Sequence, residues 1–271
     1  MILLPRSVLR LACLAWLLLS IHLPSDAQED RSTLTELRAA VKDASLTMDN
    51  RVSAYITLAP ELEDKEECVE LADLLLKQGV DGSQRVDVVV KKARALRDLS
   101  QLIEGIEILS ESIEGPESEQ DRDLCILLIE RGGLESRLKP DGPYDKSVSQ
   151  TLDDLHDALS IAEDLDDTEL KIRAHNKLGI AYGRYGDRNT AQAHFRYTLL
   201  NHTTKKQLAL ARLNSAHLLD PDRSSHQDTA LFYLREARKT FDELNDKTNY
   251  RAATLTIAKF LLSAGQLDEA K

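Results

Sequence analysis

Apolar residues recur at intervals of three and four positions from Thr33 onward, and the strict alternation of apolar and polar residues that is typical of strands is almost absent. This period places the apolar side chains on one face of a helix. The segment 86–90 is rich in valine, but it continues directly into the helix-favouring stretch 91–96, so we predict a helix there as well. The pattern therefore predicts an all-α chain.

Glycine and proline residues interrupt this helical pattern at regular places. The breaks fall at Ala59-Pro60, Gly79 to Gly82, Gly115-Pro116, Gly132-Gly133 through Gly142-Pro143, Gly186-Asp187, Asp220-Pro221 and Gly265. Each segment between two breaks is long enough for one helix or a helix pair, and we interpret Gly132-Gly133 as a helix stop. The predicted architecture is a helix, a short turn and a helix, repeated along the chain.

The segment Ile172–Lys205 carries the clearest repeat. Its characteristic residues are Leu178, Gly179, Tyr182, Gly186, Ala191 and Phe195. Their spacing resembles the tetratricopeptide repeat, an antiparallel helix pair of about 34 residues whose small residues let the two helices approach closely. His175, Thr198 and Thr203 stand where that family usually has Trp, Ala and Pro.

One such helix pair cannot bury its own apolar face, so neighbouring repeats are required. Tyr250–Lys271 repeats the Gly-to-Ala spacing, and Gln207–Leu244 supplies a middle repeat with a longer turn. Leu155–Leu165 resembles a second helix whose first helix is not recognisable. The resemblance implies an α-solenoid of stacked antiparallel helix-turn-helix repeats.

We divide the chain into three parts. Residues 1–27 are interpreted as a signal peptide, residues 28–146 as helical hairpins with degenerate repeats as an alternative, and residues 147–271 as tetratricopeptide-like repeats. The last repeat is incomplete, because Lys271 falls at the start of its second helix. We therefore expect the sequence to be the N-terminal part of a longer protein.

The first 27 residues have the three zones of an export signal. Arg6 and Arg10 give it a basic start, an apolar run covers Leu11–Leu23, and small residues stand at Ser25 and Ala27. The apolar run has 13 residues, fewer than the roughly 20 that span a bilayer. We therefore predict a signal peptide cleaved after Ala27, with an uncleaved signal anchor as the alternative, and an exported chain that is periplasmic or secreted.

Charge and cysteine content narrow the function classes. The chain has 46 acidic and 35 basic residues and a formal net charge of −11, which argues against nucleic-acid binding because phosphate contacts need a basic face. Cys68 and Cys125 each lie in an apolar helical stretch, where a free cysteine is commonly a small buried side chain. A bridge between them remains open, because export permits disulfides.

No catalytic motif is found in the sequence. It contains no phosphate-binding glycine loop, no dinucleotide fingerprint, no serine nucleophile elbow and no zinc-protease helix. The six histidines that follow the leader are scattered without the spacing of metal ligands. We predict that the chain is not an enzyme and has no cofactor and no metal site.

The resemblance implies that a protein or peptide partner binds in the concave groove lined by the first helices of the repeats. The residues that we place in this groove are Arg173, Asn176, Lys177, Ile180, Arg184, Arg212 and Lys259. The cations among them would form a basic strip, which suits an acidic peptide or a free carboxylate. The alternative is that they are ordinary solubilising charges.

Three functions follow from these features. The leading hypothesis is an exported helical-repeat scaffold that binds a protein or peptide, with membrane contact only through the signal segment or a missing C-terminal part. The second is the periplasmic sensor region of a bacterial signalling protein, whose missing part would carry a transmembrane helix and a diguanylate cyclase or histidine kinase. The third is an exported hydrolase, for which no nucleophile, base and orienting group can be nominated.

Overall fold

The computed structural model of the chain describes residues 27–115, 121–138, 148–220 and 223–263. The predicted signal peptide and the predicted incomplete end of the last repeat lie almost entirely outside these residues. Within them, all regular structure is helical, which confirms the predicted fold class. No helix in the described ranges is both long enough and apolar enough to cross a membrane.

The chain divides into two compact units between Leu99 and Ser100. The division at residue 146 in the sequence marks where the repeat pattern becomes recognisable, and it remains a prediction. The first unit contains α2 (Ala27–Lys42), α3 (Met48–Leu58), α4 (Lys65–Lys77) and α5 (Gly82–Asp98). The second unit contains α6 (Leu102–Glu114), α7 (Asp121–Glu135), α8 (Val148–Asp164), α9 (Thr168–Arg184), α10 (Arg188–Asn201), α11 (Lys205–His217), α12 (Ser224–Glu243) and α13 (Lys247–Ser263).

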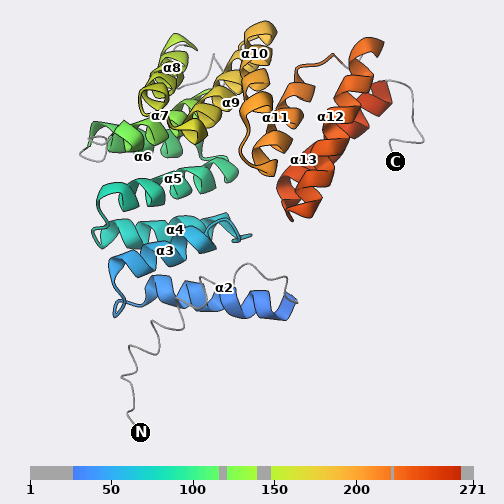
Figure 1. Cartoon of the computed structure of the whole chain (residues 1–271). Coiled ribbons are helices and arrows are strands. Elements are labelled where there is room, and N and C mark those ends of the chain that lie inside the picture. Colours follow the sequence, from blue (N-terminus) through green and yellow to red (C-terminus); the bar gives the residue numbers. More distant parts are fainter. Residues whose placement is uncertain (1–26, 116–120, 139–147, 221–222, 264–271) are drawn as a thin grey trace. The chain divides into compact units, whose positions relative to one another are not determined.

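The first unit consists of two helical hairpins around one apolar core, α2 with α3 and α4 with α5 (Figure 1). Tyr55 lies fully buried at its centre, and its hydroxyl donates to the carbonyl oxygen of Cys68 at 3.2 Å. The thiol of Cys68 is free and buried, as is that of Cys125 in the second unit. The Cys125 thiol donates to the carbonyl of Ala158 at 3.2 Å, and burial raises its pKa to about 11.

In the second unit each helix from α6 to α13 packs against the next one along the chain (Figure 1). Three of its turns share one construction. A residue with positive φ, namely Asp166, Gly186 or Asn245, is followed by an aspartate whose backbone N–H donates to the carbonyl five residues earlier. The carboxylate of that aspartate then accepts from the N–H three residues later and caps the new helix. These turns set consecutive helices antiparallel.

Helix α7 is the first helix of the pair that it forms with α8, and the sequence pattern does not reveal it. It packs on α6, α8 and α9, and an unbroken run from Cys125 to Glu130 is buried. Gly132 and Gly133 lie inside this helix, so their interpretation as a helix stop was wrong. A Cβ atom on Gly132 would stand 2.6 Å from Cγ of Leu155 in α8, and one on Gly133 would stand 2.6 Å from Nζ of Lys177 in α9. Gly132 is required by its contact with the fully buried Leu155, whereas the flexible end of the Lys177 side chain can move away from Gly133.

Candidate functional site

The first helices α7, α9, α11 and α13 contact one another along one side of the second unit, which we call the first-helix face. The carboxylate of Glu130 on α7 lies 3.1 Å from Arg173 and 3.6 Å from Lys177 on α9. Further along, Asn214 on α11 donates to Asn176 on α9 at 3.0 Å. His217 on α11 then lies 3.0 Å from the hydroxyl of Thr256 on α13. Polar contacts thus join each first helix to the next.

Several of the cations that the sequence places in the groove are neutralised by the protein's own carboxylates. Arg173 and Lys177 share Glu130, whose side chain is only 4% exposed. Arg212 lies 3.6 Å from Glu236 on α12 and is thereby directed toward the second helix of its own pair. The predicted basic strip therefore contains fewer cations without a carboxylate partner than the sequence suggests.

The remaining predicted groove residues do not pair with a carboxylate in the described ranges. Arg184 is exposed and donates to the carbonyl of Ser136 at 3.4 Å, so its charge is not neutralised. Lys259 is exposed on α13, and no carboxylate in the described ranges pairs with it. Ile180 is half-buried on α9, on the same stripe as Asn176 and Arg184 because the three stand four residues apart. These four residues define the candidate site.

The structure also gathers residues that sequence spacing does not connect. The histidine cluster consists of His156 on α8, His175 and Tyr182 on α9, and His194 and Tyr197 on α10. His175 and His194 face each other with their Nδ1 atoms 2.9 Å apart, so one ring donates and the other accepts. The Nε2 atom of His156 lies 2.9 Å from the hydroxyl of Tyr182.

The histidine cluster lies where α8, α9 and α10 meet. His175 replaces the large aromatic residue expected there in the repeat, and His194 immediately precedes the packing residue Phe195. Both histidines thus stand at or beside packing positions of one helix pair, and this is the signal that could have predicted their contact. The described part of the chain contains no group of three or more His, Cys, Asp or Glu side chains placed to hold a metal ion.

The His175–His194 contact makes stability depend on pH. Burial, together with the smaller effects of the charges of His194 and His156, lowers the pKa of His175 from 6.5 to about 4. The unfolded chain therefore takes up its proton first on acidification, and the free energy of unfolding falls as the pH falls from about 6.5 to about 4. Between pH 7.5 and 5.0 this histidine should account for a loss of about 1 to 2 kcal/mol.

Urea unfolding of the wild type and of His175→Gln at both pH values measures this loss. The variant should lose correspondingly less stability on acidification, because its amide does not titrate. His202→Gln is the matched control, since His202 is exposed outside the cluster. An equal pH dependence in the wild type and His175→Gln would contradict the assignment.

This arrangement defines the class of protein: an array of antiparallel helix pairs with the fold of tetratricopeptide-repeat proteins. Among solved structures, the chain is similar to a Rap protein complexed with Competence and Sporulation Factor, with a TM-score of 0.64 and 13% identity over 97% of this chain and 72% of that chain. It is also similar to TTC0263, a thermophilic tetratricopeptide-repeat protein in Thermus thermophilus, with a TM-score of 0.56 and 20% identity over 77% of this chain and 100% of that chain.

A third similar structure is the apo form of the quorum sensor NprR from B. thuringiensis, with a TM-score of 0.54 and 15% identity over 97% of this chain and 71% of that chain. At these identities the likeness shows the fold. No protein-family model and no curated protein sequence matches the chain.

Proposed function

We propose that this chain is an exported, non-enzymatic scaffold whose first-helix face holds an extended segment of a protein or peptide partner. The leader in residues 1–27 supports export. The helical-repeat fold supports binding, and one protein of similar fold is described in complex with Competence and Sporulation Factor. The absence of a catalytic motif from the sequence supports a role without chemistry of its own.

The observation that carries this proposal is the carboxamide pair of Asn176 and Asn214, which bridges α9 and α11 at 3.0 Å. A carboxamide both donates and accepts, as a peptide backbone requires. The half-buried Ile180 and the exposed Arg184 continue the same stripe of α9. Together they offer contacts for a backbone, an apolar side chain and a carboxylate.

Peptides selected from a random phage library on the chain without residues 1–27 test this proposal. Their dissociation constants, measured by fluorescence anisotropy, should rise at least about tenfold in Asn176→Ala/Arg184→Glu, because a hydrogen bond and a charge pair are lost. Arg173 is a poorer position for charge reversal, because a glutamate there would face the buried Glu130.

Arg251→Glu is the matched control for this experiment, since Arg251 is exposed on α13 and belongs to no predicted site. Circular dichroism verifies that each variant remains helical. Selected peptides that bind the double variant as tightly as the wild type would refute the first-helix face as the binding site.

The second candidate function is the sensor region of a bacterial signalling protein. One protein of similar fold is described as a quorum sensor, and another as a signal transduction ATPase with a tetratricopeptide repeat sensor from Pyrococcus horikoshii. Reading the gene beyond the codon for Lys271 tests this candidate. A long apolar run followed by a kinase or cyclase domain would support it, and a stop codon there would eliminate it.

A further inference from the structure

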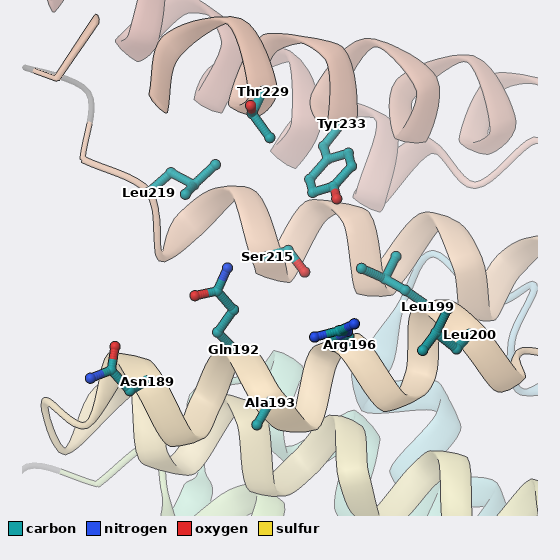
Figure 2. A pocket seen from close by; sticks show the side chains of 10 residues that line it. All are labelled: Asn189, Gln192, Ala193, Arg196, Leu199, Leu200, Ser215, Leu219, Thr229 and Tyr233. Carbon is teal, nitrogen blue, oxygen red and sulfur yellow. The ribbon is translucent and has the colours of Figure 1, made fainter. Parts of the chain in front are cut away.

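A hollow of about 780 Å³ lies between the second helices α10 and α12, with α11 as its floor (Figure 2). It is lined by Asn189, Gln192, Ala193, Arg196, Leu199, Leu200, Ser215, Leu219, Thr229 and Tyr233. Its volume falls in the range of roughly 300 to 1,000 Å³ that is usual for ligand sites. We call it the outer hollow.

The space one helix pair earlier, among α8, α9 and α10, holds the rings of the histidine cluster, which reach from these three helices and contact one another. The outer hollow is lined instead by Ser215 of α11 and by Leu219, which follows the end of that helix. Among its lining residues the only ring is that of Tyr233 on α12.

Ser215 leaves a hydrogen-bonding group unused in the outer hollow. The residue is 8% exposed, and its hydroxyl is buried with no hydrogen-bond partner among the described residues. In Figure 2 this hydroxyl points away from α11 toward the side of α10 that carries Arg196. A buried hydroxyl without a partner is unfavourable, so a polar group that enters the hollow would gain from bonding to it.

The wall formed by α10 carries a polar stripe. Asn189, Gln192 and Arg196 stand three and four residues apart and are all exposed, so they lie along one face of the helix. The carboxamides can donate to and accept from a peptide backbone. Arg196 pairs with no carboxylate in the described ranges, and none of the ten lining side chains is acidic. This charge is complementary to a carboxylate.

Apolar groups complete the outer hollow. Leu200 is 71% exposed at the end of α10, and Leu219 and Tyr233 are half-buried on the opposite side. Phe232, the neighbour of Tyr233 on α12, is 56% exposed. Burying one leucine-sized side chain here would favour binding through the hydrophobic effect. A ligand that fits must therefore combine apolar and anionic groups.

We propose that the outer hollow binds a short peptide segment that combines acidic and leucine-like side chains. A carboxylate of the peptide pairs with Arg196, its backbone bonds to Asn189 and Gln192, and an apolar side chain lies among Leu200, Leu219 and Tyr233. The carboxamides favour a peptide over a fatty acid, which has no backbone amides to satisfy them. This site is separate from the first-helix face, so either proposal can fail without the other.

Fluorescein-labelled pools of random octapeptides test the assignment by anisotropy. A pool built from Leu, Glu and Ser should bind the chain. Matched pools in which Lys replaces Glu, or from which Leu is omitted, should bind at least tenfold more weakly. Arg196→Glu should weaken binding of the first pool at least tenfold, and Ser215→Ala about threefold through the loss of one hydrogen bond.

All of these measurements are made in the background of Asn176→Ala/Arg184→Glu, because the first-helix face offers similar contacts and would otherwise bind the same pool. In that background, Arg251→Glu makes the same charge change outside the hollow and should leave binding of the pool unchanged. The proposal is overturned if the background variant does not bind the pool of Leu, Glu and Ser, if the lysine pool binds equally well, or if Arg196→Glu leaves the affinity unchanged.

Discussion

Replacing Arg131 by Met is expected to lower the free energy of unfolding by about 3 kcal/mol. Arg131 on α7 forms two parallel hydrogen bonds of 2.9 Å to the carboxylate of Asp154 on α8. The same guanidinium lies 3.4 Å from Ser110 on α6 and 3.9 Å from Glu135, whose side chain is 1% exposed. Without the cation, two carboxylates of low exposure, Asp154 and Glu135, lose their ion pair with Arg131. Urea unfolding followed by circular dichroism measures the loss.

Arg122→Met is the matched control on the same helix. Arg122 pairs with Asp167 at 3.5 Å, but its side chain is 56% exposed, so its removal should cost less than about 1 kcal/mol. Arg131→Lys should fall between the two, because lysine retains the charge but not the planar fork. Equal losses for Arg131→Met and Arg122→Met would show that the Arg131 contacts do not stabilise the fold.

Adding one methyl group at Gly179 is expected to lower the free energy of unfolding by about 2 kcal/mol. A Cβ atom there would stand 2.6, 2.8 and 2.9 Å from three ring atoms of Phe195 on α10. Phe195 is 2% exposed and enclosed, so the ring can move aside only if α9 and α10 separate. This cost exceeds the gain of up to about 1 kcal/mol that alanine brings to a helix interior.

Gly183→Ala separates the steric cost from the helix propensity. Gly183 lies one turn further along α9, where an added Cβ atom would meet Cδ2 of Leu218 at 2.9 Å and Ala191 at 3.7 Å. A single terminal methyl group can rotate away, so this variant should equal or slightly exceed the wild type in stability. A stable Gly179→Ala variant would contradict the close packing of α9 on α10.

A feature of the fold could be predicted from the sequence only where it restricts the type of residue at a given position. Gly179, Phe195 and Gly186 were recognisable because close helix contact and a turn with positive φ both restrict the residue type locally. The turns at Asp166 and Asn245 have the same backbone conformation, but they contain neither glycine nor proline and were not recognised. Gly132 and Gly133 led to the wrong prediction of a helix stop, because a glycine that permits close packing looks the same in sequence as one that ends a helix.

The residues of the candidate site could be proposed from the sequence, but the ion pairs that neutralise some of their charges could not. Helical periodicity places Arg173, Asn176, Lys177 and Arg184 on one face of α9 (Thr168–Arg184), and their role in a binding groove stays a prediction. Glu130 lies more than 40 residues earlier in the sequence, inside a helix whose pattern is apolar on nearly all sides. Its pairing with Arg173 and Lys177 had no local signal.

The helical class of the chain, its clearest helix pair and the expected polar face of that pair can be predicted from the sequence alone, because these features depend on periods of three and four residues. Tertiary structure decided which cations remain free to bind, which histidines meet, and where a space stays open between second helices. These properties arise from contacts between residues far apart in the chain. Glu130 neutralises Arg173 and Lys177, and Ser215 lines the outer hollow, only because folding brings distant helices next to them.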